Sequence, residues 1–169
     1  MASNPKSRRI DPIQFEVVRS ALTQVAEEMA AALRRSAYST NVKTRQDFSC
    51  AFFDRNCRPI SQAFTQPVHL GSFVELIPTS VETYGAENLE PGDMLVVNNP
   101  FGGGSHLNDV TVFGPVHHNG ELVGYVASLA HHVDVGGGAP ASIGPFQEIF
   151  QEGIIIPPVK LVKRGEMNE

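Results

Sequence analysis

The chain has 169 residues, of which 41% are hydrophobic and 18% are charged, and these proportions are typical of one ordinary globular domain. The net charge of −5 argues against a nucleic acid or an anionic membrane as the main partner. No stretch approaches the roughly 18 uninterrupted apolar residues of a membrane span, and residues 1–10 do not open a signal peptide. We therefore expect a cytoplasmic protein whose residues 1–10 are disordered.

A long amphipathic helix is expected to begin at Asp11. This residue is a good N-cap, Pro12 suits the first helical position, and Gln14 stands three residues after the cap. Apolar residues follow at spacings of three and four, namely Phe15, Val18, Leu22, Val25, Met29 and Leu33. We expect this stripe to be buried against the core, and a partner-binding helix is the alternative.

Short β-prone runs follow the helix, at residues 48–53, 94–97, 110–113 and 122–129. Asn119 and Gly120 supply the positive φ values of a tight hairpin turn, so residues 110–116 should pair antiparallel with residues 122–129. The expected fold class is α+β, with an N-terminal amphipathic helix packed on a mainly antiparallel sheet.

Two later segments are unlike ordinary helix or strand. Residues 136–145 contain four glycines and two prolines and predict a long Gly-rich loop. The run at residues 154–162 is strongly apolar although it lies near the last residue, so we expect an exposed apolar patch and a truncated domain. Cys50 and Cys57 are too few for a disulfide framework and are expected to be buried thiols.

The six histidines lie within one 64-residue window, at positions 69, 106, 117, 118, 131 and 132. Counting outward from the hairpin turn pairs Val110 with Leu129, and this register places residues 106–109 beside His131. His106 and Asp109 then approach His131, a donor set that suits zinc, manganese or iron better than calcium or magnesium. The alternative is a solvated loop with an Asp turn cap.

The other histidines are interpreted separately. His131 and His132 point to opposite faces if the strand continues, so one of them is expected to bind the metal while the other packs. His117 and His118 should lie on the surface at the turn. His69 is open to two interpretations, a catalytic residue that orients substrate or acts as a general base, or a packed and hydrogen-bonded histidine.

Two familiar kinds of catalytic or nucleotide site are missing from the sequence. The glycines at 102–104 belong to neither GxxxxGK[ST] nor GxGxxG, and a β-prone run rather than a helix follows them, so no ATP-binding loop is expected. Ser105 neighbours His106, but no GxSxG elbow is present, and covalent catalysis is not expected.

Motifs along nearly the whole chain resemble the N-terminal part of the hydantoinase B and oxoprolinase family, which includes caprolactamase-like enzymes and acetone carboxylase α subunits. The motifs include DFSCA (47–51), PVHLG (67–71), HLND (106–109), AHHVDVGG (130–137) and PPVKL (157–161). The resemblance implies that residues 11–169 are one N-terminal segment of a longer hydantoinase B-like domain. It also implies a divalent metal held by His106, Asp109 and His131, with Asp47 joining in some members.

The same resemblance implies a partner, a hydantoinase A-type ATPase subunit that phosphorylates a carbonyl or amide oxygen of a small-molecule substrate. ATP would thus act only through the partner. The resemblance further implies an oligomer that hydrolyses cyclic amides. Two positions depart from the family's usual Asn-Asp-Pro-Tyr segment, where this chain has Asn99 and Phe101. The alternative function is a noncatalytic remnant that acts as a binding or assembly module, and the sequence selects neither the substrate nor hydrolysis over carboxylation.

Overall fold

The computed structural model describes residues 11–142 and 144–169 of the chain, so the expectation of disorder for residues 1–10 lies outside the described residues. The strands are β1 (Phe48–Asp54), β2 (Pro59–Gln62), β3 (Met94–Val97), β4 (Asp109–His118), β5 (Glu121–His131), β6 (Val159–Lys163) and β7 (Glu166–Met167). The α-helices are α1 (Pro12–Ser36), α2 (Thr40–Lys43) and α3 (Pro67–Tyr84). Short 3₁₀ turns are η1 (Ala86–Asn88), η2 (Pro100–Gly102), η3 (Pro140–Ser142) and η4 (Ile149–Gln151).

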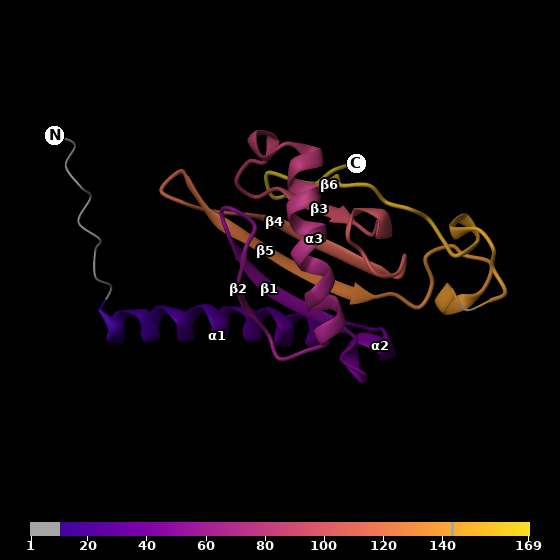
Figure 1. The fold of residues 1–169 in the computed structure, drawn as a ribbon, viewed down its shortest axis with the longest axis horizontal. Helices are drawn as coiled ribbons and strands as arrows, with labels where there is room; N and C mark the ends of the chain where they lie inside the picture. Colours follow the sequence, from indigo (N-terminus) through magenta and orange to yellow (C-terminus); the bar gives the residue numbers. More distant parts are fainter. Residues whose placement is uncertain (1–10, 143) are drawn as a thin grey trace.

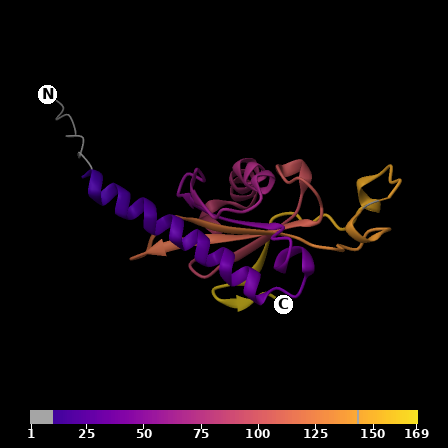
Figure 2. The ribbon, with the colours of Figure 1, turned by 90° about the horizontal axis from the view of Figure 1, so that it is seen from below.

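The strands form one seven-stranded sheet in the order β2-β1-β5-β4-β3-β6-β7. Every pairing between neighbours in that order is antiparallel. Figures 1 and 2 show α3 on one face of the sheet and α1 on the other. The expected α+β class, the four expected strands and the hairpin between β4 and β5 are confirmed.

The larger core lies between the sheet and α3. It consists of alternate strand residues and one apolar side of the helix, and Phe53 of β1 meets Phe73 of α3 edge to face with ring centroids 6.0 Å apart. A smaller core joins α1 to β1 and includes Ala26, Phe48 and Cys50. Cys50 and Cys57 are both free and buried, as expected.

Helix α1 is buried along only part of its length, whereas burial of the whole apolar stripe was expected. Asp11 caps it by accepting a hydrogen bond from the Ile13 N–H at 3.0 Å. The C-terminal half packs on β1 through Ala26 and Ala30, but Phe15 and Val18 in the N-terminal half are more than half exposed. A helix of 25 residues is about 37 Å long, whereas the 7 residues of β1 span about 23 Å. The helix therefore extends past the sheet (Figure 2).

The two unusual late segments also have defined positions. The described residues of the expected Gly-rich loop, 136–142 and 144–145, contain no strand, and their only helical piece is η3. The apolar run at 154–162 is partly used, because its end becomes β6 and pairs with β3. Ile154 and Val159 are nonetheless 61% and 41% exposed, so the expected apolar exposure is confirmed for these two side chains.

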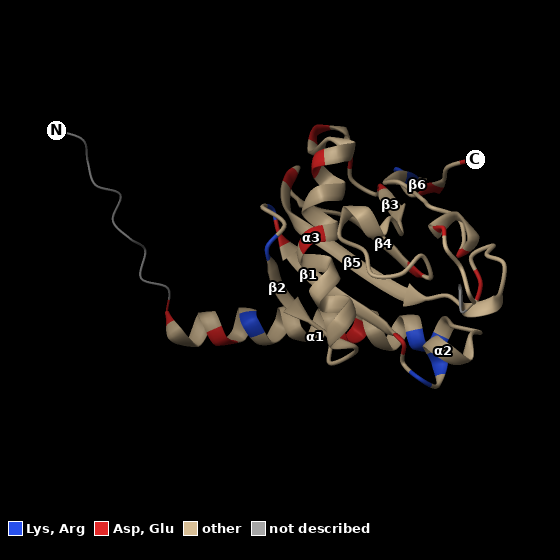
Figure 3. Cartoon of the chain, turned by 45° about the vertical axis from the view of Figure 1, so that its right-hand side comes forward, with Lys and Arg blue, Asp and Glu red and all other residues tan. Residues whose placement is uncertain are grey.

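Basic residues lie in the last turns of two helices. Arg34 and Arg35 lie in the last turn of α1 and Lys43 in the last turn of α2, where cations interact favourably with the helix dipole. Figure 3 shows this small group of basic residues around α2.

Within the described ranges, no helix combines the length and apolar character needed to cross a membrane.

A buried ion pair fixes the hairpin of β6 and β7 to the rest of the sheet. Asp93 is 1% exposed, and its carboxylate accepts from Lys160 Nζ at 2.6 Å and from the backbone N–H groups of Glu90 and Arg164 at 2.8 Å. Burial raises the pKa of Asp93, but these bonds lower it by more, so the pKa lies below its ordinary value.

The substitution D93N tests this anchor. We expect it to lower the free energy of unfolding at pH 7 by about 1–3 kcal/mol, measured by urea denaturation, while E121Q on the exposed hairpin turn changes little. Because the folded pKa is depressed, the stabilisation is present above the ordinary pKa of about 3.9 and is lost as the pH falls through the folded pKa. A difference from wild type that grew between pH 7 and pH 3 would contradict the assignment.

Candidate metal centre

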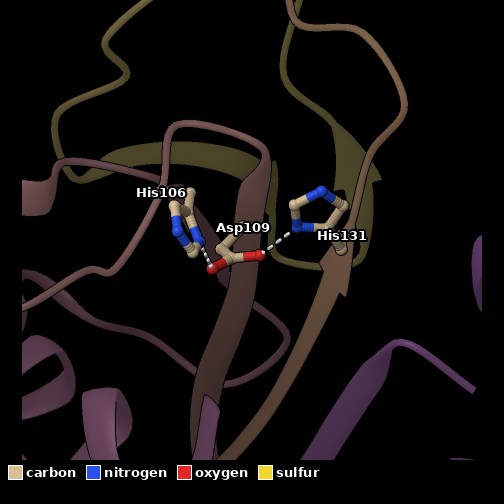
Figure 4. Close-up of side chains that lie close together, drawn as sticks. All are labelled: His106, Asp109 and His131. Carbon is tan, nitrogen blue, oxygen red and sulfur yellow. Dashed lines mark hydrogen bonds and ion pairs between the residues drawn. The ribbon is translucent and has the colours of Figure 1, made fainter. Parts of the chain in front are cut away.

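The candidate site lies at one end of the sheet, where β4 begins and β5 ends. Asp109 is the first residue of β4 and His131 is the last residue of β5, and the two are direct cross-strand partners. Directly opposite residues of an antiparallel pair have their side chains on the same face. His131 Nδ1 accordingly lies 2.7 Å from Asp109 Oδ1 (Figure 4).

One extra residue in β5 decides this pairing. His117 pairs with Leu122, but Val116 pairs with Gly124, so Val123 is a bulge. The sequence count that paired Val110 with Leu129 is therefore wrong by one residue, because Val110 faces Ala130. Without the bulge, Asp109 would oppose Ala130 and His131 would point to the other face.

Gly124 is the sequence signal for this bulge. A Cβ added at this position would collide with the Phe53 carbonyl oxygen of the neighbouring strand β1. Only glycine fits such a close approach between strands. A lone glycine within a β-prone run is a recognised indication of a bulge, and it could have corrected the register.

The third member of the group comes from the loop before β4. His106 Nδ1 lies 3.2 Å from Asp109 Oδ2, and the backbone N–H of Asp109 donates to the carbonyl of His106 at 3.0 Å. The ligand atoms of His106, Asp109 and His131 all lie within 4.8 Å of one another. The His106 side chain is 66% exposed, whereas that of Asp109 is 1% exposed. The group is thus buried at Asp109 and open to solvent at His106.

Two more of the sequence-predicted residues reach the same place. His69 lies in the first turn of α3, and its Nε2 atom is 3.5 Å from Asp47 Oδ1 and 3.8 Å from Asp109 Oδ1. Asp47 immediately precedes β1, and its carbonyl accepts the backbone N–H of His131 at 3.0 Å. The structure therefore brings together all five expected residues, from α3, from the loop before β4 and from the ends of three strands.

Electrostatics link the members of this group. Burial raises the pKa of Asp109, but hydrogen bonds from His131 and Ser105, with smaller effects of His69 and His106, hold the pKa well below its ordinary range. The hydrogen bond to Asp109 raises the pKa of His131. Burial lowers the pKa of His69 despite the nearby carboxylates. Asp109 is therefore ionised and His69 is neutral at neutral pH.

The remaining histidines stand outside the group. His117 and His118 lie beside the hairpin turn, at the opposite end of β4 from Asp109. His118 is exposed, as expected, whereas His117 is partly buried and its Nδ1 atom is inaccessible to solvent. The His132 side chain is exposed, and its backbone N–H donates to the Asn108 carbonyl at 2.8 Å. Of the adjacent pair, His131 alone therefore faces Asp109.

Buried asparagines that the sequence did not mark as functional hold the segments of the site in place. Asn98 is 0% exposed, and its amide donates to the carbonyls of Leu107 at 2.7 Å and Ile154 at 2.9 Å while its oxygen accepts the Ile156 N–H. Asn108 donates from its side chain to the His132 carbonyl at 2.8 Å. These bonds join the loop of His106 to the tail on one side and to β5 on the other.

The two departures from the family's segment do not alter the group. Asn99 accepts the backbone N–H of Phe101 at 3.0 Å and so caps the short turn η2. Phe101 is 79% exposed. Neither residue contacts the five sequence-predicted residues through any bond recorded within the described part of the chain.

The substitution H69L tests the contact of His69 with the two carboxylates. Leucine fills similar space but leaves Asp47 and Asp109 without the N–H that faces them, so we expect the free energy of unfolding in EDTA to fall by about 1–2 kcal/mol. The matched control is H117L, because His117 also has a buried, unpartnered Nδ1 but lies next to the turn. Equal stability of H69L and wild type would show that the contact contributes nothing.

Comparisons with known proteins agree on one family. The family model described as hydantoinase B/oxoprolinase matches residues 11–169. The uncharacterized protein MJ0963 of Methanocaldococcus jannaschii is 47% identical over 163 residues, which are 95% of this chain and 29% of that protein. The 5-oxoprolinase of Dictyostelium discoideum is 40% identical over 168 residues, 99% of this chain and 13% of that enzyme. The chain thus spans less than a third of the length of these relatives.

Solved structures show the same fold. The ATP-dependent caprolactamase of Pseudomonas jessenii superposes with a TM-score of 0.80 at 34% identity, over 95% of this chain and 28% of that chain. The nucleotide-free acetone carboxylase superposes with a TM-score of 0.86 over 95% of this chain and 22% of that chain. Its identity is 21%, so this second likeness concerns the fold alone.

Proposed function

The chain belongs to the hydantoinase B/oxoprolinase family, and on this premise we propose that it is the metal-binding part of an ATP-dependent cyclic amidohydrolase. It would act on a small cyclic amide whose carbonyl is activated by a hydantoinase A-type ATPase subunit. Relatives named as a caprolactamase subunit beta and as 5-oxoprolinases support this substrate class. The absence of a nucleotide-binding motif from the sequence is in keeping with ATP acting through the partner.

The observation that carries the proposal is the convergence of His106, Asp109 and His131. Two ligands that each lie about 2.1 Å from one ion are at most about 4.2 Å apart. The three ligand atoms lie within 4.8 Å of one another, so a small closure would bring them onto one ion. Two imidazoles and a carboxylate suit zinc, manganese or iron. The residue set therefore fits a divalent metal, with Asp47 as a further carboxylate on the side of His69.

A divalent metal in this place would polarise an activated carbonyl or lower the pKa of a bound water towards 7. The chain's own residues would set the conditions for that chemistry. Asp109 supplies a buried negative charge that favours a cation, and the exposed side of His106 leaves the group open to a small molecule. The Asp47 side chain, which is 30% exposed, is also partly accessible to solvent.

His69 is proposed to act through its Nε2 atom. Its side chain is 4% exposed, and its Nδ1 atom has no hydrogen-bond partner within residues 11–142 and 144–169. We therefore assign the proton of the neutral ring to Nε2, which faces Asp47 and Asp109. A proton held there faces both carboxylates, with Nε2 3.5 Å from Asp47 Oδ1 and 3.8 Å from Asp109 Oδ1. The geometry favours this positioning role, and a general base would need the substrate itself to reach Nε2.

The second candidate function is a noncatalytic binding or assembly module that retains the metal. The two candidates differ when the chain is mixed with its A-type subunit. ATP-dependent ring opening of hydantoin or 5-oxoproline, monitored through the release of phosphate, would support the enzymatic function. A stable complex that binds metal but never turns over supports the module.

Metal analysis of histidine variants tests the proposal directly. We expect purified wild type to bind close to one equivalent of Zn²⁺ or Mn²⁺ and H131A to lose most of it, because removal of a ligand leaves the site incomplete. H117A and H118A are the matched controls, since they change histidines near the hairpin turn, and they should bind metal as wild type does. Equal metal content in all three variants would refute the ligand assignment.

A further inference from the structure

We propose that Ser105 is a positioning residue of the candidate metal centre, whose hydroxyl holds one oxygen of Asp109 and so presents the other oxygen to the cation. The inference rests on the proposed function, because it assigns a role in metal binding to a residue outside the ligand set. Ser105 precedes His106 in the loop that leads into β4.

The contact that carries the inference is short. Ser105 Oγ donates to Asp109 Oδ2 at 2.6 Å. His106 Nδ1 approaches the same oxygen at 3.2 Å, and His131 Nδ1 approaches Oδ1 at 2.7 Å. Both oxygens of Asp109 therefore have close polar partners in the metal-free protein.

These donors differ in what happens when a cation enters. An imidazole nitrogen that binds a metal does so through its lone pair and carries no proton. If the Nδ1 atoms of His106 and His131, which lie nearest Asp109, bind the cation, they present lone pairs to it and donate nothing to the carboxylate. The hydroxyl of Ser105 keeps its proton. Ser105 is consequently a close donor that can hold Asp109 in a loaded site whichever ring nitrogens bind the cation.

The glycines before Ser105 explain how its hydroxyl is placed. Gly103 has φ = 102°, and a Cβ added there would lie 2.6 Å from the backbone nitrogen of Leu76 in α3. The loop therefore packs directly against the backbone of α3, as no other residue type would allow. The glycine run belongs to no nucleotide-binding motif, and its role in this inference is to fix the position of Ser105.

The size of the expected effect follows from related metal sites. Groups that orient a metal ligand without touching the metal typically change metal affinity by about 10–100-fold when they are removed. Ser105 bonds directly to a ligand carboxylate, so its loss belongs to this class. The effect should appear in metal affinity while the metal-free fold is retained, because Ser105 is only partly buried.

The experiment compares three variants of the full chain by calorimetric titration with Mn²⁺ and, in parallel, with Zn²⁺. We expect S105A to bind about 10–100-fold more weakly than wild type, and S105T, which keeps the hydroxyl, to recover most of the affinity. T111V is the matched control, because Thr111 lies on the same strand as Asp109 and its buried hydroxyl has no hydrogen-bond partner among the residues that the structure describes. Its removal should leave affinity unchanged.

The outcomes separate this inference from the proposed function. Wild-type affinity in S105A, or affinity as weak in S105T as in S105A, would overturn the role of the Ser105 hydroxyl while leaving the metal site intact. Failure of the wild type to bind either cation would overturn the metal site itself and the inference with it. Thermal unfolding of metal-free S105A near the wild-type midpoint, together with weakened binding, would support the positioning role against general loss of structure.

Discussion

The burial of one ionised carboxylate organises the functional end of this molecule. An isolated carboxylate costs several kcal/mol to remove from water, and Asp109 is 1% exposed at the start of a central strand. Its charge is compatible with folding because His131 contacts one of its oxygens and Ser105 and His106 contact the other. The same negative charge, surrounded by nitrogen atoms that can lose their protons, is what a divalent cation requires. The apo contacts and the proposed metal site are thus two states of one arrangement.

The rest of the fold keeps that arrangement in register. The bulge at Val123 turns His131 to the face of Asp109, and Gly124 permits the close approach of β1. Asn98 joins the loop of the site to the tail, whose strand β6 pairs with β3. A helix on one face brings His69 over the strand ends. Segments far apart in the chain are needed for a site whose three proposed ligands come from one hairpin and the loop before it.

Much of this could be read from the sequence because the signals are local. The cap at Asp11, the turn at Asn119 and the β-prone runs depend on neighbouring residues, and the structure contains the corresponding helix, hairpin and strands. The proximity of His106 and Asp109 to His131 was also predictable, since a hairpin has few registers. The one-residue error arose because a bulge depends on what the neighbouring strand β1 allows at Gly124.

Features that depend on distant contacts could not be predicted in this way. The apolar stripe of α1 is continuous in the sequence, but burial stops where the sheet stops, which leaves Phe15 and Val18 exposed. The amide of Asn98 finds partners 9, 56 and 58 residues away. The sequence shows that Ser105 neighbours His106, and Ser105 was therefore considered only as a nucleophile. The contact of its hydroxyl with Asp109 depends on the fold of the loop. Family resemblance supplied Asp47, for which no local pattern exists.

The most direct test of the central claim is anomalous diffraction from crystals of the chain grown with Mn²⁺ or Zn²⁺. The account predicts one strong anomalous peak bonded to His106, Asp109 and His131, on the side of the group that Asp47 and His69 also face. A peak bound elsewhere, or clear density for His131 still hydrogen-bonded to Asp109 with no anomalous signal at saturating metal, would contradict it.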